Sequence, residues 1–406
     1  MEVPADITRY SYEFTSADVT DRLGYSVAID GPRAAIGAPG SPSTSTEPGA
    51  AYVVDVVTGN LVLKLSASDA APNHAFGSSI AINSSFIVVG SSHDIARGWG
   101  TGSAYVFDAT TGEQRFKLIG ADSAGTDLFG TSLAITGESV IVGAPRNRNA
   151  GPDAGSAYVF SATTGQQAFQ LNASYAQPSD RFGSSVAAIG NLALVGAPSG
   201  FAVSPGTAYL FDLTSGQQLS RLTAADVVNG DEFGSAVAIH GNVAIVGAAR
   251  AGLSGAAFVF DVTDPSDPVL LRKLTASDGS SGDGLGLSAT VHGSLAIIGA
   301  PGDDDFGFNS GSAYLFDVYT GAQLGKFQPS NPSDGLFGWS ATISNDVVLV
   351  GAPFENNAVG SAYVFFLVPE PNRLLMSFVG AVLLLPAIRR CRRTRPASQR
   401  KWPPAV

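Results

Sequence analysis

The sequence has little sulfur and little charge. Its 406 residues include one cysteine and two methionines, and only 14% are charged. Because the single cysteine is Cys391, residues 1–368 contain neither a disulfide nor a thiolate metal site. The four histidines are isolated, and G-x-S-x-G, H-E-x-x-H and Walker motifs are missing from the sequence. We therefore expect no enzymatic activity, and a protein that is either cytosolic or exported with a self-sufficient core.

Basic residues are scarce everywhere except at the C-terminus. The segment 369–406 holds eight basic residues and one acidic residue, a net charge of +7. The remaining 15 basic and 33 acidic residues give 1–368 a net charge of −18. An acidic body repels phosphate groups, so nucleic-acid binding is excluded. The basic end is attracted to an anionic membrane surface.

Glycine is abundant, with 48 residues, and it marks a repeat. One glycine, preceded by Phe or Leu, recurs at steps of 51 to 53 residues: Gly24, Gly77, Gly130, Gly183, Gly234, Gly286 and Gly338. A second glycine follows each of these 13 residues later: Gly37, Gly90, Gly143, Gly196, Gly247, Gly299 and Gly351. Five of these seven begin Gly-Ala-Pro, whereas Gly90 begins Gly-Ser-Ser and Gly247 begins Gly-Ala-Ala. Seven copies with a constant internal spacing indicate one structural unit repeated seven times.

Each copy contains four short apolar segments separated by Gly and Asn turns. In the fourth copy they are SSVAAI (184–189), LALVGA (192–197), TAYLFDL (207–213) and QQLSRLT (217–223). Segments of this length and composition predict β-strands joined by hairpins. The second segment is apolar almost throughout, as expected of an inner strand that is buried on both faces. Four strands in about 50 residues are typical of a propeller blade.

The two ends of the repeat region complement each other. The seventh copy stops after its third strand, GSAYVFFLV (360–368), and ITRYSYEFTSAD (7–18) resembles the fourth strand of other copies. We therefore predict an all-β, seven-bladed propeller over 7–368, closed by pairing of the N-terminal strand with 361–367. Closure leaves no long exposed sheet edge along the ring.

The strand order assigns the loops to two faces. Loops from second to third strand, and from each blade to the next, are longer and share one face. That face collects acidic residues, namely Asp94, Asp153, Asp231, Glu232, Asp278, Asp283, Asp303, Asp304, Asp305 and Glu355. Each acid by itself is best explained as a solvating residue. We expect the face as a whole to bind a partner, because variable loops on a rigid scaffold usually carry binding.

The paired Phe-Gly and Gly-Ala-Pro signatures resemble FG-GAP repeats of the bacterial, integrin α-like type. The sixth copy carries them in LGLSATVHGSLAIIGAPGDDDFGFNSGSAYLF (285–316). The family's calcium-binding blades have an Asp-rich loop between the first two strands, and the turns here lack the oxygen ligands that calcium needs. Calcium is therefore not carried over from the resemblance. A different oxygen-rich cluster remains as the candidate metal site: Asp278, Asp283, Asp303, Asp304 and Asp305.

The C-terminal segment 369–395 resembles a PEP-CTERM sorting signal. It contains Pro369, Glu370 and Pro371, the apolar run 374–388, and then Arg389, Arg390, Arg392 and Arg393. The resemblance implies recognition by an exosortase-type enzyme in the membrane. The run predicts a short hydrophobic helix, with arginines on the cytoplasmic side and the propeller outside. An interfacial anchor is the alternative. We expect the basic, Pro-containing end 396–406 to be disordered.

Export conflicts with the first residues, MEVPADITRY, which lack a basic start and an apolar run. We expect a misassigned start rather than a lost signal. We thus predict an exported surface or matrix protein that binds a surface protein or glycan and needs no cofactor. The alternative is a quinoprotein-like enzyme, because FDATTGEQRFKL (107–118) has the D-x-x-T-G turn of such blades but not the tryptophan that follows it.

Overall fold

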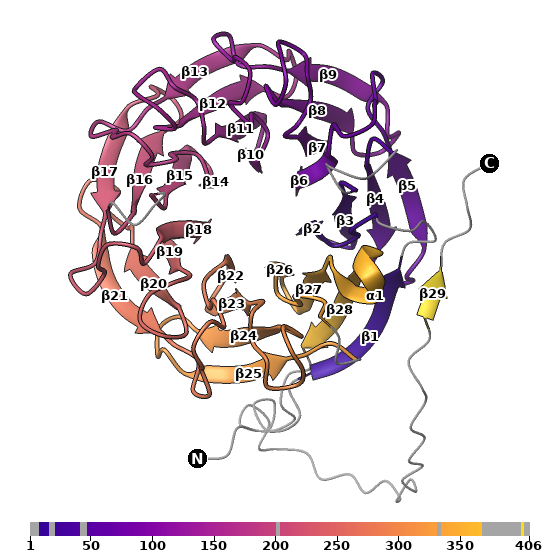
Figure 1. Cartoon of the computed structure of the whole chain (residues 1–406), viewed down its shortest axis with the longest axis vertical. Helices are drawn as coiled ribbons and strands as arrows, with labels where there is room; N and C mark the ends of the chain where they lie inside the picture. The colour runs from indigo at the N-terminus through magenta and orange to yellow at the C-terminus, as the bar shows by residue number, and fades with distance from the viewer. Residues whose placement is uncertain are drawn as a thin grey trace, which may run out of the picture.

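The computed structural model describes residues 8–15, 21–40, 47–199, 204–330, 334–367 and 399–401. Seven antiparallel sheets stand around a central axis, as Figure 1 shows. Within each sheet, strands that follow one another along the chain are hydrogen-bonded neighbours. The predicted seven-bladed propeller is therefore confirmed.

The innermost strand of each blade lines the axis, and the second strand packs outside it. The innermost strands are β2 (Ser26–Asp30), β6 (Phe76–Ile82), β10 (Ser132–Thr136), β14 (Ser185–Ile189), β18 (Phe233–His240), β22 (Ser288–His292) and β26 (Ser340–Ser344). The second strands are β3 (Arg33–Ala38), β7 (Phe86–Ser91), β11 (Ser139–Ala144), β15 (Leu192–Ala197), β19 (Val243–Ala248), β23 (Leu295–Ala300) and β27 (Val347–Ala352). Each second strand is buried almost throughout, because other strands flank it and neighbouring blades cover both its faces.

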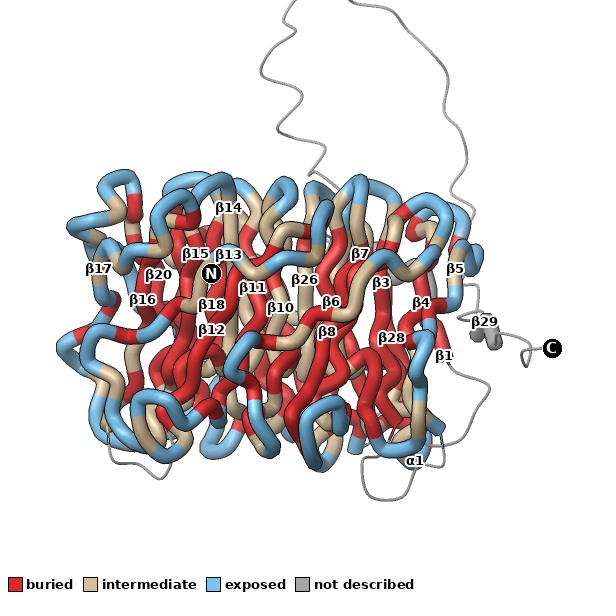
Figure 2. Tube along the Cα trace, turned by 90° about the horizontal axis from the view of Figure 1, so that it is seen from above, coloured by how far each residue is buried: buried red, intermediate tan, exposed pale blue. Residues whose placement is uncertain are grey.

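The third and fourth strands form the outer half of each blade. The third strands are β4 (Ala50–Asp55), β8 (Ser103–Asp108), β12 (Ser156–Ser161), β16 (Thr207–Asp212), β20 (Ala256–Asp261), β24 (Ser312–Asp317) and β28 (Ser361–Leu367). The fourth strands of the first six blades are β5 (Leu61–Leu65), β9 (Gln114–Leu118), β13 (Gln167–Leu171), β17 (Gln218–Leu222), β21 (Val269–Leu274) and β25 (Gln323–Phe327). Burial falls from the third strand to the fourth, and the loops at both ends of the blades are exposed (Figure 2).

The N-terminal strand completes blade seven, as the sequence predicts. β1 (Thr8–Thr15) pairs antiparallel with β28, with Thr8 opposite Leu367 and Thr15 opposite Ser361. A three-residue strand, β29 (Gln399–Lys401), adds in parallel to the outer edge of β1. These residues lie within 396–406, for which the sequence predicts disorder, and the outer edge of β1 offers them backbone partners.

Apolar side chains between the blades form the core. Seven buried clusters each join two neighbouring blades, and the cluster between blades seven and one contains Phe14 from β1 beside Ile36 and Val364. Aromatic pairs recur in these clusters; Phe76 of blade two lies 5.5 Å from Tyr105 and 6.0 Å from Phe107, edge to face. Each blade therefore depends on its neighbours for burial, and closure of the ring buries the last two faces.

The two glycine signatures meet where blades join. A Cβ on Gly143, in the Gly-Ala-Pro signature of blade three, would overlap the carbonyl oxygen of Gly183 in blade four. Gly183 itself has a φ of 88°, which disfavours a side chain, and its N–H donates a 3.0 Å bond to the Gly196 carbonyl of its own blade. Gly351 meets Gly24 in the same way where the ring closes. The repeat therefore conserves its glycines for close backbone contact between blades.

A serine hydroxyl bridges most of the same junctions. Ser132 donates a 2.8 Å bond to the Gly183 carbonyl, and Ser340 donates a 2.8 Å bond to the Gly24 carbonyl across the closure. Blade five has Ala236 at this position, and the preceding Ser235 makes the bond to Gly286 instead, at 3.1 Å. These serines therefore belong to the joint between neighbouring blades.

Helical structure is almost missing from the described residues. It consists of α1 (Glu355–Ala358), one turn in which Asn356 and Asn357 are left-handed, and no helix in the described part is long and apolar enough to cross a membrane. The predicted sorting motif Pro369–Pro371, the hydrophobic run 374–388 and the arginine cluster lie outside the described residues.

Candidate functional site

The longer loops share one face of the ring, as the strand order predicts. We call it the long-loop face; it carries the loops from second to third strand and from each blade to the next. α1, in the loop between β27 and β28, marks it at the lower edge of Figure 2. The short hairpins lie on the opposite face, which we call the hairpin face. All ten acids named from the sequence lie in loops of the long-loop face.

In blade two, the acidic residue Asp94 forms bonds inside its own blade. Asp94 is 1% exposed and lies 2.7 Å from the Tyr105 hydroxyl and 2.8 Å from the Lys117 ammonium. Asp69, which arrives from the exit loop of blade one, lies 2.8 Å from Tyr105 and 2.5 Å from Lys117. One lysine and one tyrosine therefore join a loop within the blade to a loop from the previous blade, which makes Asp94 structural rather than solvating.

Blade six repeats this arrangement at the predicted metal site. The Lys326 ammonium lies 2.8 Å from Asp278, 2.9 Å from Asp303 and 2.7 Å from Asp305, and Tyr314 donates a 2.6 Å bond to Asp303. An ammonium therefore occupies the centre of three of the five carboxylates proposed for calcium. No group of three or more His, Cys, Asp or Glu among the described residues is arranged for a metal. The geometry favours a structural ion cluster.

The other two carboxylates of that prediction lie apart from Lys326. Asp283 is buried and accepts a 2.6 Å bond from the Ser280 N–H, and burial raises its pKa. Asp304 is exposed. Calcium at these five residues thus remains a prediction that the geometry does not favour.

Other blades vary the cluster in a consistent way. Blade three has the uncharged Asn147 and Gln170 where blade two has Asp94 and Lys117, and both amides lie within hydrogen-bond distance of Tyr158. Blade five has Phe258 in place of the tyrosine and Ala251 in place of the acid. Blade five nevertheless keeps a lysine, Lys273, which lies 2.5 Å from Asp226 in the preceding exit loop. The pair of lysine and exit-loop aspartate therefore persists where the buried acid is lost.

The remaining acids are also mostly engaged. Asp231 is 6% exposed and accepts a 2.8 Å bond from the Val228 N–H. Glu232 lies 3.2 Å from Arg250, and Asp153 lies 3.7 Å from Arg148. The explanation that each acid solvates the surface is therefore wrong for the buried ones: Asp94, Asp231, Asp283, Asp303 and Glu355.

The long-loop face also exposes large apolar side chains. Seven large hydrophobic side chains stand out of its loops, at 43% to 79% exposure: Ile95, Trp99, Tyr175, Val228, Leu253, Phe306 and Phe308. Exposed aromatic side chains of this kind are enriched at binding interfaces. Trp99 is 70% exposed and lies edge to face with His93, with ring centroids 6.3 Å apart. Sequence reasoning did not single out these side chains, because their exposure is known only once the buried positions of the fold are known.

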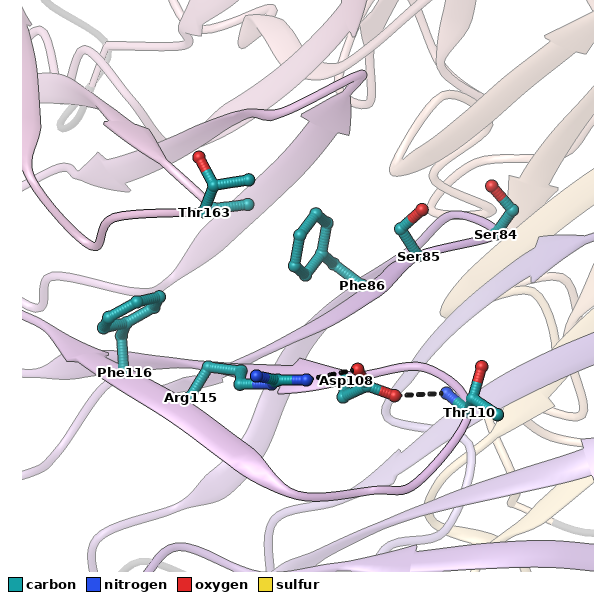
Figure 3. Close-up of a pocket in the computed structure, with 9 residues that line it drawn as sticks. Ser84, Ser85, Phe86, Asp108, Thr110, Arg115, Phe116 and Thr163 are labelled. Atoms are coloured by element: carbon teal, nitrogen blue, oxygen red, sulfur yellow. Dashed lines mark hydrogen bonds and ion pairs between the residues drawn. The ribbon is translucent and has the colours of Figure 1, made fainter.

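The hairpin face carries a polar pocket between blades two and three (Figure 3). Its volume is about 410 Å³, and Asp108, Arg115, Phe86 and Phe116 help to line it. Arg115 lies 2.7 Å from Asp108. The backbone N–H of Thr111 and the Arg115 guanidinium hold the pKa of Asp108 well below its usual range. The charges of this pocket are thus already paired with each other.

The same aspartate explains the D-x-x-T-G turn. Asp108 accepts 2.9 Å bonds from the N–H groups of Thr110 and Thr111, and Asp55 and Asp317 cap the equivalent hairpins of blades one and six. The turn that resembles a quinoprotein blade is therefore a hairpin cap here.

The histidines are dispersed between both faces. His74 is buried on the long-loop face, 3.8 Å from Asp94. His240 and His292 occupy equivalent turns of neighbouring blades, with ring centroids 4.5 Å apart. Burial and the neighbouring His292 lower the pKa of His240, and its Nδ1 accepts a 3.1 Å bond from the Gly293 N–H.

Comparison with known families agrees with this geometry. The FG-GAP repeat family matches seven segments: 16–54, 60–107, 113–160, 166–211, 217–260, 269–316 and 325–365. The chain belongs to the FG-GAP repeat family. A search of curated proteins found no match. Each matched segment of this FG-GAP propeller begins in or near the outer strand of one blade and ends in the third strand of the next.

The tyrosine–acid–lysine cluster was not foreseen, although the repeat carries a signal for it. Tyr105, Tyr158 and Tyr314, which belong to the repeated GSAY segments, are buried. Aligning the copies places a lysine opposite this tyrosine in blades one, two and six, at Lys64, Lys117 and Lys326. Only in blades two and six does that lysine coincide with an aspartate four residues after the second glycine, and this combination is the signal that the sequence carries.

Proposed function

We propose that this FG-GAP propeller is an exported cell-surface or extracellular-matrix protein that binds a partner through its long-loop face. One observation carries the proposal: seven large apolar side chains are exposed on the long-loop face. Two of the loops that present them are fixed by buried ion pairs, Asp94 with Lys117 and Asp303 with Lys326. A rigid scaffold lowers the entropic cost of ordering a binding surface, so such side chains are suited to adhesion.

The tail supports the exported location through its sequence. Pro369, Glu370 and Pro371, the apolar run 374–388 and the arginines at 389–393 form the order of a PEP-CTERM signal. We propose that an exosortase-type enzyme processes or anchors this tail. Intact mass and fractionation of the native protein from its own host test this. A mature form ending near Pro369 outside the cytoplasm is expected, and a full-length cytoplasmic product would overturn it.

Binding is tested separately, with purified full-length protein added to washed host cells. The variant Trp99→Ser/Tyr175→Ser/Phe308→Ser removes three exposed aromatic side chains of the long-loop face, and we expect at least a tenfold loss of cell binding. The control Val57→Ser/Tyr319→Ser changes exposed side chains of the hairpin face, and it should bind as the wild type does. Equal loss in both variants, or no binding by the wild type, would overturn the proposed contact face.

A further inference from the structure

A hollow of about 260 Å³ lies where the central channel begins on the long-loop face. It is lined by the residues that start the seven innermost strands, visible around the opening in Figure 1. The residue after each Phe-Gly or Leu-Gly glycine stands at its lip. These seven lip residues are not alike, and their order around the ring divides the lip into two arcs.

The first arc is apolar and spans three consecutive blades. It consists of Leu287 in blade six, Trp339 in blade seven and Tyr25 in blade one. The Trp339 and Tyr25 rings are 5.5 Å apart at an angle of 49°. Behind them, Phe354 lies edge to face with Trp339 at 5.7 Å, and the Arg22 guanidinium lies 5.1 Å above the Phe354 ring. This packing holds the aromatic wall in place.

The second arc is made of hydroxyls and spans the other four blades. It consists of Ser78, Thr131, Ser184 and Ser235. Three of them give their hydrogen to a backbone carbonyl; Thr131 donates to Leu128 at 2.7 Å and Ser184 donates to Arg181 at 2.7 Å. The lone pairs of Thr131 and Ser184 are therefore left to accept hydrogen bonds from a ligand. Ser235 and Ser78 already accept bonds from the N–H groups of Ala249 and Ser92, at 3.3 Å and 3.2 Å.

The lining carries no formal charge. Tyr25 is its one ionisable side chain among the described residues, and burial raises the pKa of that phenol, which keeps it neutral. The innermost strands are edge strands, so some of their backbone groups face the axis. A suitable ligand is therefore neutral, with one apolar face and several hydroxyl donors. The volume is below the roughly 300–1,000 Å³ of pockets for drug-sized ligands, so the hollow admits one small ring.

We propose that this hollow binds one neutral sugar ring, such as a hexose at the end of a glycan. The apolar face of the ring packs on Trp339 and Tyr25, and its hydroxyls donate to Thr131 and Ser184. Because the hollow opens on the long-loop face, the rest of the glycan leaves toward the exposed loops. The inference rests on the proposed binding function and names the ligand class for it.

The test uses full-length protein and four probes: the methyl glycosides of glucose, galactose, mannose and N-acetylglucosamine. Saturation-transfer NMR and calorimetry measure binding of each. We expect at least one to bind, and Trp339→Ser, which copies the lip residue of blades two, four and five, to weaken that binding at least tenfold. Tyr319→Ser, an exposed aromatic residue on the hairpin face and outside the hollow, is the control and should bind as the wild type does.

A second variant tests the site in case Trp339→Ser does not fold. Thr131→Val keeps the side-chain shape, removes the acceptor, and should weaken sugar binding severalfold while the protein stays folded by circular dichroism. Failure of all four glycosides to bind, or wild-type affinity in Trp339→Ser, would overturn the sugar site. If cell binding still depends on Trp99, Tyr175 and Phe308, only the sugar inference has failed. If cell binding is also missing, the proposed function has failed with it.

Discussion

The Tyr363 hydroxyl donates a 2.6 Å hydrogen bond to the Glu355 carboxylate in the blade that closes the ring. Tyr363 also lies opposite Glu13 in the pairing of β28 with β1, whereas Tyr314 and Tyr105 lie opposite lysines in blades six and two. Glu13 and Glu355 are 3% and 2% exposed. The closure therefore buries two carboxyl groups where those blades pair a carboxylate with an ammonium.

This arrangement predicts that Glu355→Gln stabilises the propeller at neutral pH. Burial and the nearby Glu13 raise the pKa of Glu355 above its ordinary value of 4.5. A carboxyl group whose pKa is higher in the folded state favours folding while it is protonated. This contribution is complete below the unfolded-state pKa and is lost as pH rises through the folded-state pKa. Glutamine keeps the acceptor for Tyr363 without the charge. We expect a gain of about 1 kcal/mol in the free energy of unfolding at pH 7.

Urea unfolding at pH 4 and pH 7 measures this gain, which should shrink toward pH 4. The control is Glu138→Gln, an exposed glutamate on the hairpin face that should change little at either pH. A loss of stability in Glu355→Gln at pH 7 would contradict the account of the closure.

The ion cluster of blade six predicts a rescue by a second mutation. Lys326→Gln leaves the buried Asp303 carboxylate without its ammonium, and we expect it to lower the free energy of unfolding by about 3 kcal/mol. Adding Asp303→Asn copies the neutral pair that blade three carries in Asn147 and Gln170. The double variant should recover most of the loss in a urea titration. If the double variant is no more stable than Lys326→Gln, the two side chains do not act as a pair.

The contact between blades predicts a position-specific cost of adding one methyl group. Gly143→Ala places a Cβ against the Gly183 carbonyl, where both partners are backbone and neither can move aside. We expect it to cost at least about 3 kcal/mol, or to prevent folding. Gly325→Ala is the control, because nothing lies within 4 Å of its Cβ and its φ is not left-handed. Thermal unfolding separates the two, and equal effects would show that the blade contact is not what the glycine provides.

The serine bridge predicts an exchange between neighbouring positions. Ser132→Ala removes the bond to the Gly183 carbonyl and should cost about 1 kcal/mol. Thr131→Ser combined with Ser132→Ala recreates the Ser235–Ala236 pair of blade five, and the new serine should restore the bond. The comparison is made by thermal unfolding of the three proteins. A double variant as unstable as Ser132→Ala would mean that the shifted bond depends on other features of blade five.

Much of the architecture followed from the repeat. Seven copies of two glycines 13 residues apart fixed the number of blades, and the resemblance of 7–18 to an outer strand identified the pairing of β1 with β28. In the fourth copy, the predicted segment 192–197 coincides with β15, and the other segments differ from their strands by one or two residues. The prediction succeeded because strand length, turn residues and alternation are local properties that a repeat shows several times over.

The site was harder to predict. The acids of the long-loop face were visible, but Asp94 and Glu232 read alike in the sequence, and the first is buried against Lys117 while the second pairs with exposed Arg250. The lip of the channel combines single residues from seven blades, roughly 50 positions apart. Neither the burial of a single side chain nor a group of residues from seven different blades produces a local pattern in the sequence.

The sequence by itself determined the strands, their grouping into seven blades and the closure of the ring, because each depends on short segments repeated along the chain. The tertiary structure decided which acidic side chains form the bonds that hold the loops, and which apolar side chains remain exposed. It also decided that Tyr25 lies beside Trp339 at the axis. The physical reason is that burial and pairing depend on what the neighbouring blade contributes. That neighbour is fixed only when the ring has closed.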